Sequence, residues 1–546
     1  MSENLFLGLD LSTQSLTALI LDPTMNIREE VSIDFDHAYP HYGTHAGVPA
    51  SDDPLQVHVD PLMWLEALDD MLGKLQEKRL TGRIAAIAVS AQQHGTVYLN
   101  ERVVPTLAGL NPLSALHTGL SGIFSRPTCP IWMDSSTERE CLEITRSLGG
   151  EAAVIRLTGS AATERFAGPQ IRKFWKRDPV AYGRTEHIAL ISSFVTSVLT
   201  GRLAPLDCGD GYGTNLADIR TGDWSEAAME AAAPGLKHRL PRLLRKDEQV
   251  GRVSPYVARR FGFRLETEVV VGSGDNPSSL VGLGLVGMPG LRAVSLGTSD
   301  TCFGYLPELA DAEHTDGHIF GAADGRYMFL VCFKNGSLAR EKIKDHFGLS
   351  WDDFSRMLLE TASGNHGRIL LPYFMPEITP RVLRPRVWRF GGLEAEDVAG
   401  NVRAVAEAQA MAMYLHSGWT GLRPQTILVT AGGSGNPGLL TVISQVFGAE
   451  VRTLEVKESA ALGAAIRAAH ARLNRYEGGV SWRELWEAGM STGATHIARP
   501  AEEAVRIYQG PGGLLEVYAA CERFALGKGP DPEEPIKAYR EGFCGP

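Results

Sequence analysis

Short apolar runs separated by small polar turns mark the start of the chain. Leu5 to Leu9 is continuously apolar, as is typical of a strand buried on both faces of a sheet. The polar turn 10–15 follows, and a second apolar run extends from Leu16 to Leu21. The pattern predicts a strand–turn–strand unit with hydroxyl groups and one carboxylate at its tip.

The same arrangement recurs just past the middle of the chain. Leu291 to Leu296 is mostly apolar, 297–301 is a small polar turn, and Cys302 to Tyr305 resumes an apolar strand. Two such units indicate a duplicated fold with two related parts. Hairpins with Ser or Thr at their tips are common, so the pair alone is also compatible with chance.

Strands and helices alternate along the rest of the sequence, which is typical of an α/β architecture. Strands are expected at 84–90, 268–271, 327–333 and 426–429, and helices at about 189–199, 402–415, 437–447 and 459–469. Gly463 lies inside the last of these helices and would let it pack closely. The segment from about residue 500 onward has a mixed pattern and is expected to be a peripheral tail.

Composition and charge narrow the classes of function. The 546 residues are too many for one ordinary core, and 64 acidic against 53 basic residues give a net charge of −11. Such a chain is a poor candidate for binding nucleic acid or an anionic membrane. No apolar run approaches the ~18 residues of a spanning helix, and no secretion signal is recognisable. Seven scattered cysteines without a C-x-x-C pair indicate reduced thiols, no zinc site and a cytoplasmic protein.

Several familiar motifs are absent from the sequence or interrupted. It contains no P-loop, no H-E-x-x-H, no G-x-S-x-G and no protein-kinase set. His37, His41 and His45 are spaced four apart, but Pro40 and Gly43 would interrupt a helix through them. We therefore expect a loop there and no metal site.

A glycine-rich segment, Gly433 to Gly438, follows one predicted strand and precedes a helix. It is formally a G-x-G-x-x-G fingerprint, which would indicate a dinucleotide-binding oxidoreductase. Glycines at a helix start also let backbone lie against the base or phosphate of another nucleotide. A tight strand-to-helix turn without a ligand is the third possibility.

Polar residues at the ends of two other predicted strands are candidates for chemistry. Asp275 ends an apolar strand between small residues, which suits either a general base or the N-cap of the next helix. Gln93 and His94 follow the strand at 84–90 and are suited to hydrogen-bonding a polyhydroxylated ligand. Arg165 fits a ligand contact or a surface ion pair equally well.

Taken together, these segments resemble the FGGY carbohydrate kinases of the sugar-kinase/actin/heat-shock superfamily, and within them the eukaryotic-type xylulose kinases. Ser136 departs from the many bacterial members that carry Arg there, and the segment 36–62 is long, as in the eukaryotic type. Six segments carry the resemblance in order: Gly8–Gln14, Gln92–Gly95, Trp132–Thr137, Gly274–Asn276, Gly297–Ser299 and Gly432–Asn436.

The resemblance implies an α/β fold of two ribonuclease-H-like lobes, 1–286 and 287–546, with ATP and sugar in an interdomain cleft. The implied reaction converts D-xylulose and ATP to D-xylulose 5-phosphate and ADP with Mg²⁺, in a monomer or homodimer. Other sugars (ribulose, glycerol, gluconate or a tetritol), a non-catalytic sugar sensor and an NAD-dependent oxidoreductase remain alternatives.

The resemblance also implies a role for individual residues. Asp275 is the expected catalytic base, and Asp10 is expected to hold Mg²⁺ through water, because Mg²⁺ dehydrates reluctantly. The sugar is expected to contact Gln93, His94, Arg165, Asp275 and Asn276. ATP is expected to contact Thr13, Gln14, Gly297, Thr298, Trp351, Gly432, Gly433 and Asn436.

Overall fold

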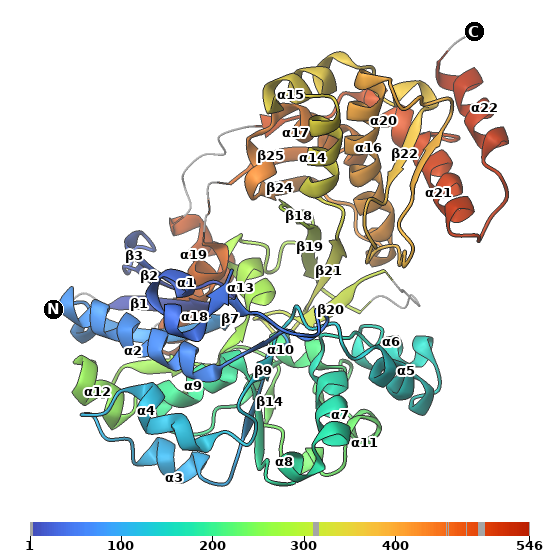
Figure 1. Ribbon diagram of the computed structural model, residues 1–546. Helices are drawn as coiled ribbons and strands as arrows, with labels where there is room; N and C mark the ends of the chain where they lie inside the picture. The colour runs from blue at the N-terminus through green and yellow to red at the C-terminus, as the bar shows by residue number, and fades with distance from the viewer. Residues whose placement is uncertain are drawn as a thin grey trace. The chain divides into compact units, whose positions relative to one another are not determined.

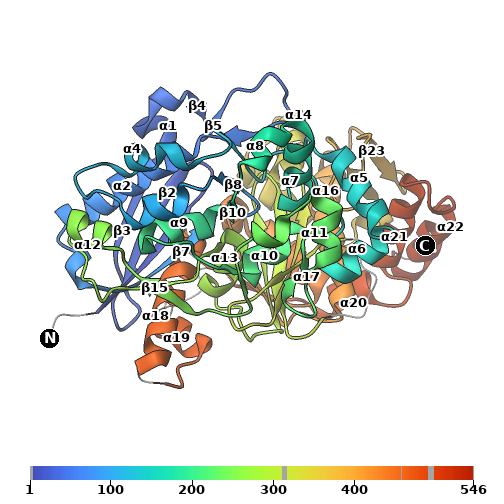
Figure 2. The same cartoon turned by 90° about the horizontal axis from the view of Figure 1, so that it is seen from below.

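The computed structural model describes residues 4–309, 316–454, 456, 458–476, 478–489 and 497–544 (Figures 1 and 2). Contacts along the chain define two units. The first contains Met1–Gly287, His318–Met328 and Glu458–Ser491, and the second contains Met288–Gly317, Phe329–Lys457 and Thr492–Pro546. The boundary proposed at residue 286 stays a prediction, because two later segments group with the first unit.

The first unit is built on a sheet whose strands run in the order β15-β16-β7-β1-β2-β3. β1 and β2 form the antiparallel hairpin that the apolar runs predict, and every residue of β1 is buried. β7 runs parallel to both β1 and β16, so their carboxyl ends meet at one edge. The bounds are β1 Leu5–Leu11, β2 Ser15–Leu21, β3 Ile27–Asp34, β7 Ile84–Ala91, β15 Gln249–Arg252 and β16 Glu268–Val270.

Helix α18 (Ser459–Tyr476) completes the core of the first unit although it comes late in the chain (Figure 1). It lies so close to β1 that a Cβ on Gly8 would be 2.1 Å from the Ala461 carbonyl oxygen. It lies equally close to α13 (Asp275–Gly282), since a Cβ on Gly463 would be 1.8 Å from the Ser278 carbonyl oxygen. The expectation that Gly463 permits close packing is confirmed.

The second unit repeats the same strand order, β21-β19-β18-β24-β25. β18 pairs antiparallel with β19 and parallel with β24, as β1 does with β2 and β7. Both units therefore have the mixed-sheet order of a ribonuclease-H-like fold, and the predicted duplication is confirmed. The bounds are β18 Leu291–Leu296, β19 Asp300–Leu306, β21 Tyr327–Phe333, β24 Thr426–Thr430 and β25 Glu450–Thr453.

The helices of the second unit include the C-terminal segment, so the expectation of a peripheral tail is wrong. Tyr508, Tyr518 and Tyr539 from that segment are buried in the core of the unit. Arg403 Nη2 donates to Tyr508 Oη over 2.7 Å. The helices are α14 Ser337–His346, α15 Trp351–Glu360, α16 Val398–His416, α17 Pro437–Phe447, α20 Glu502–Gln509, α21 Leu514–Ala525 and α22 Glu533–Phe543.

The structure also bears on three smaller expectations, which concern membrane-spanning helices, the cysteines and the three spaced histidines. Among the helices of the described residues, none combines the length and apolar character needed to cross a bilayer. All seven cysteines are free thiols. The three spaced histidines lie in short α1 (Phe35–Ala38), a 3₁₀ turn and strand β4 (Thr44–His45), and His41 contacts Glu66. That segment is not one helix, as the interrupting Pro40 predicted.

Candidate active site

Two carboxylates lie at the carboxyl edge of the first sheet. Asp10 of β1 is paired with Ser90 of β7, whose hydroxyl donates to Asp10 Oδ1 over 2.6 Å. β17 (Ser273–Gly274) pairs with the end of β7, and Asp275 follows it directly. Because the carboxyl ends of parallel strands meet at one edge, residues far apart in sequence converge there.

Asp275 is not the N-cap of helix α13, which resolves the alternative left open by the sequence. Gly274 occupies the cap position, and Asp275 is the first helical residue. The Asp275 carboxylate instead accepts from the backbone N–H of Asn276 over 2.8 Å. A Cβ at position 274 would lie 2.2 Å from Gln93 Cγ, so only glycine permits this approach.

The environment places both carboxyl pKa values near neutrality. Burial raises the pKa of Asp275 to about 6, against the opposing effect of hydrogen bonds from Asn276 and Gln93. Burial raises the pKa of Asp10 to about 7, and the charge of Asp275 adds to it although the Ser90 hydroxyl opposes it. A carboxylate with a pKa near the working pH is well matched to general base catalysis.

Amide and imidazole groups surround Asp275. Asn276 Nδ2 donates to Gln93 Oε1 over 2.9 Å, and Gln93 Nε2 donates to the Gly209 carbonyl over 3.1 Å. His94 Nδ1 lies 2.9 Å from the Gly213 carbonyl, which can only accept, so Nδ1 carries the proton. Burial lowers the pKa of His94 to about 3, with a further contribution from Arg165.

His94 is thus a neutral ring whose Nε2 is an acceptor for a hydroxyl hydrogen. Its backbone has φ +71°, in the left-handed region that non-glycine residues rarely adopt and that is concentrated at functional sites. Arg165 does not form the alternative surface ion pair: within the described residues its hydrogen bond goes to His318 Nε2 over 3.2 Å.

The polar turn after β1 is held from two sides. Trp132 Nε1 donates to Thr13 Oγ1 over 2.8 Å, and the Phe35 backbone N–H donates to the Gln14 carbonyl over 2.9 Å. A Cβ on Gly47, where φ is +77°, would lie 1.9 Å from the Thr13 carbonyl oxygen. The long segment 36–62 therefore packs its β4–β5 hairpin directly on this turn. β5 spans Val48–Pro49.

Ser136 has a cation, Lys173, beside it. Lys173 Nζ donates to Ser136 Oγ, and that hydroxyl donates to the buried Asp134 carboxylate. Asp134 also accepts from Gln170 Nε2 over 2.7 Å and from the Val57 backbone N–H over 3.0 Å. These bonds and one from His58 outweigh burial and hold the pKa of Asp134 well below its usual value.

A pocket of about 660 Å³ lies in the second unit. Its size is that of a small-molecule site. Asn436 Oδ1 accepts from the Leu439 backbone N–H over 3.1 Å, which fixes the amide as the N-cap of α17. Trp351 is 41% exposed at the start of α15 and lines the pocket, with Lys344 Nζ 5.6 Å from its ring centroid. Six of the predicted nucleotide contacts line the pocket: Gly297, Thr298, Trp351, Gly432, Gly433 and Asn436.

A buried ion pair lies next to the Gly297–Ser299 turn. Arg340 donates to both oxygens of Asp300, over 2.7 and 3.0 Å, and to Gln409 Oε1 over 2.8 Å. Both side chains of the pair are at most 2% exposed. The Ser337 backbone N–H donates to the Gly297 carbonyl over 2.9 Å. Asp300, which the sequence placed in a polar turn, is therefore an internal anchor of that turn.

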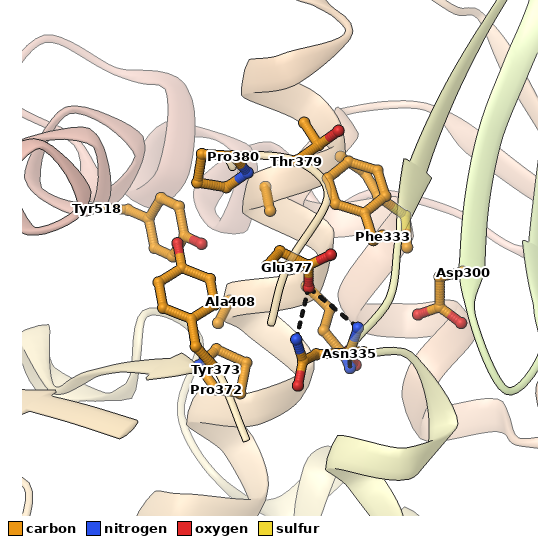
Figure 3. A pocket seen from close by; sticks show the side chains of 13 residues that line it. Asp300, Phe333, Asn335, Pro372, Tyr373, Glu377, Thr379, Pro380, Ala408 and Tyr518 are labelled. Atoms are coloured by element: carbon orange, nitrogen blue, oxygen red, sulfur yellow. Dashed lines mark hydrogen bonds between the residues drawn. The ribbon is translucent and has the colours of Figure 1, made fainter. Parts of the chain in front are cut away.

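The anchor continues into a small cavity of about 20 Å³, shown in Figure 3. Gln409 Nε2 donates to the Asn335 carbonyl over 2.7 Å. Asn335 in turn donates to Glu377 Oε2 through its backbone N–H, over 3.0 Å, and its side-chain amide, over 2.8 Å. The cavity has room for about one water molecule, so it is too small to be a substrate site.

The chain is similar to known proteins over almost its whole length. Residues 127–282 match the N-terminal domain of the FGGY family of carbohydrate kinases, and residues 292–472 match the C-terminal domain. A xylulose kinase of Rattus norvegicus is 39% identical over 537 residues, which cover 97% of this chain and 98% of the relative. Xylulose kinase 2 of Arabidopsis thaliana is 39% identical over 512 residues, 90% of this chain and 91% of the relative.

Solved structures show the same fold. A xylulose kinase from Rhodospirillum rubrum superposes with a TM-score of 0.79 at 18% identity, covering 96% of this chain and 99% of the other. A gluconate kinase from Lactobacillus acidophilus superposes with a TM-score of 0.78 at 18% identity, covering 96% and 98%. At such identities the likeness concerns the fold alone, and it is shared by enzymes named for different substrates.

Proposed function

Because the chain belongs to the FGGY family of carbohydrate kinases, we propose that it transfers the γ-phosphoryl group of ATP to D-xylulose, giving D-xylulose 5-phosphate and ADP. The environment of Asp275 is the main observation in support of this proposal. Its carboxylate is only partly exposed, its pKa is raised, and amides suited to sugar hydroxyls lie beside it.

Asp275 acts as the general base in this proposal. It takes the proton from the C5 hydroxyl as that oxygen forms a bond to the γ-phosphorus. The bond from the γ-phosphorus to the bridging oxygen breaks, and its electrons leave with ADP. The transition states of phosphoryl transfer are loose. The positioning of the two substrates and the electrostatic stabilisation of the phosphoryl oxygens therefore contribute most of the acceleration. His94, Arg165 and Asn276, with Gln93, hold the other hydroxyls.

The remaining residues bind the nucleotide. Trp351 stacks on the adenine base, and Gly432, Gly433 and Asn436 bound the adenosine in the pocket of the second unit. Gly297 and Thr298, together with Thr13 and Gln14, donate to the phosphates. Gly297 has no side chain, so its backbone N–H group can approach an anion closely.

The residues present fit a magnesium ion. Mg²⁺ is held in kinases by one or two carboxylates together with phosphate oxygens and water. Asp10 supplies one such carboxylate at the sheet edge, fixed by the Ser90 hydroxyl. A magnesium ion bound at Asp10 would counter the negative charge of the ATP phosphates.

The test of the proposed function is ATP turnover with and without sugar. D-xylulose is expected to raise ADP release well above a slow basal hydrolysis, and more than ribulose, glycerol, gluconate or a tetritol at equal concentration. A coupled ADP assay measures all five. Equal turnover with and without every sugar would contradict a kinase, whereas sugar binding without ADP release would favour a sensor.

The pH dependence follows from Asp275. A base works only when ionised, so kcat/KM for the sugar should fall about tenfold per pH unit once the pH drops below about 6. Above that value the carboxylate is charged and the rate should level off. The profile is measured at saturating ATP and Mg²⁺. A rate independent of pH between about 5 and about 8 would rule out this base.

A further inference from the structure

Strand β20 (His318–Gly321) is part of the first unit although it lies inside the sequence that matches the C-terminal family domain. The Ile319 backbone N–H donates to the Gly159 carbonyl over 3.0 Å, and a Cβ on Gly159 would lie 2.9 Å from Ile319 Cβ. On the same strand, a Cβ on Gly321 would lie 2.6 Å from Cys208 Cβ. These close backbone contacts fix the direction of the side chains that β20 carries.

The side chains of β20 belong to the same ring cluster as His94. The ring of Phe166 stacks on that of His94 with centroids 4.4 Å apart, and the His318 ring lies 5.2 Å from Phe166. Phe320 lies 6.0 Å from His94 and 5.7 Å from His318. β20 therefore supplies part of the wall behind the proposed sugar site.

Hydrogen-bond chemistry defines the state of His318. The guanidinium of Arg165 can only donate, so His318 Nε2, 3.2 Å from Arg165 Nη2, accepts. Nδ1 must then carry the proton, which it donates to Ser160 Oγ over 3.2 Å. His318 is thus a neutral ring, tethered through Ser160 on one side and directed at Arg165 on the other.

A neutral acceptor has a particular consequence for Arg165. Among the described residues, no carboxylate forms an ion pair with this guanidinium, and its hydrogen bond goes to the imidazole of His318. A carboxylate partner would compete with sugar oxygens for the same N–H donors. The imidazole uses a single donor and leaves the others for a ligand.

We propose that His318 is a positioning residue for sugar recognition, which accepts one N–H of Arg165 and so directs the remaining donors at the hydroxyls of the sugar bound beside His94. The inference rests on the proposed function. The proposal adds a residue that influences substrate choice. In the sequence this residue lies far from the other sugar contacts, between strands β19 and β21.

The test is a double-mutant cycle on the affinity for D-xylulose, measured as Kd by calorimetry. His318→Phe keeps a ring between Phe166 and Phe320 but removes the acceptor, and Kd is expected to rise about 10- to 100-fold. Combining it with Arg165→Met should weaken binding no further than Arg165→Met alone, since both act through one interaction. The sugar KM should rise in parallel with Kd, and kcat should change much less.

His318→Gln retains an acceptor oxygen and is expected to recover most of the affinity. Tyr327→Phe is the matched control: it removes a hydrogen bond from the same hairpin to the Ile219 carbonyl, without touching Arg165, and should bind sugar as the wild type does. An unchanged Kd in His318→Phe, additive losses in the double variant, or an equal loss in Tyr327→Phe would overturn the proposal. Binding without turnover in the wild type would count against the kinase alone.

Discussion

Asp275→Asn should lower kcat for sugar phosphorylation by about 10²- to 10⁴-fold, because the amide keeps the shape of the side chain but cannot take a proton. The amide oxygen can still accept from the Asn276 backbone N–H, which now bonds Asp275 Oδ1 over 2.8 Å, so the start of α13 is preserved. ATP affinity should be retained, because the proposed nucleotide pocket lies in the second unit. Steady-state kinetics and calorimetry with an ATP analogue measure the two effects.

The matched control is Asp22→Asn, a buried carboxylate just after β2 that holds a turn around Thr24 and Asn26 and pairs with Arg28. It should keep its kcat. The residual activity of Asp275→Asn should also lose the step near pH 6. If Asp275→Asn worked at nearly the wild-type rate, the base would have to be another group, with Asp10 the nearest candidate.

Arg340→Met should lower the free energy of unfolding by about 3–5 kcal/mol, since it leaves the Asp300 carboxylate buried and without its cation. Burial already raises the pKa of Asp300, which shows how strongly that site disfavours an uncompensated charge. The turn carrying Thr298 should lose its anchor as well, and ATP binding should weaken. Urea denaturation and calorimetry are the measurements.

Two further variants show whether the pairing itself is responsible. Arg340→Met combined with Asp300→Asn removes both charges and should recover a large part of the lost stability. Arg356→Met breaks an ion pair with Asp353 that is open to solvent, and it should be close to the wild type. A loss in Arg356→Met as large as in Arg340→Met would contradict the assignment of the anchor.

The sequence predicted secondary structure correctly where the run of apolar residues matches the residues that are buried. The hairpin of Leu5–Leu21 was predictable because both strands are buried along almost their whole length. The helix expected from residue 189 begins instead at Ile191, because His187–Leu190 pairs as β10 with β8 (Thr96–Leu99). A four-residue strand that ends at a helix has no periodicity of its own, so pattern alone could not separate the two.

The C-terminal segment was misjudged for a related reason. Helices α20 and α22 bury only two residues each, whereas α21 buries six, including Tyr518. A mixed pattern of this kind is also what a surface segment shows. The burial of Tyr508 and Tyr518 and the hydrogen bond from Arg403 to Tyr508 show that the segment completes the second unit.

For the site, the order of short motifs identified the residues, but spacing could not identify their partners. The bond from Trp132 to Thr13 joins positions 119 residues apart, and that from Arg165 to His318 joins positions 153 apart. Lys173 beside Ser136 had no sequence signal at all, because a lysine on a polar helix face is ordinarily solvated. Such pairs become visible only once the fold brings the elements together.

The position of α18 late in the sequence affects how the first unit folds during translation. The strands β1 and β7 emerge from the ribosome early, yet the helix whose backbone fits against Gly8 is translated only after strands β18 to β25 of the second sheet. Until then one layer of the N-terminal half has apolar surface open to water and to chaperones. Premature termination before residue 459 would therefore damage the half of the molecule that was made first.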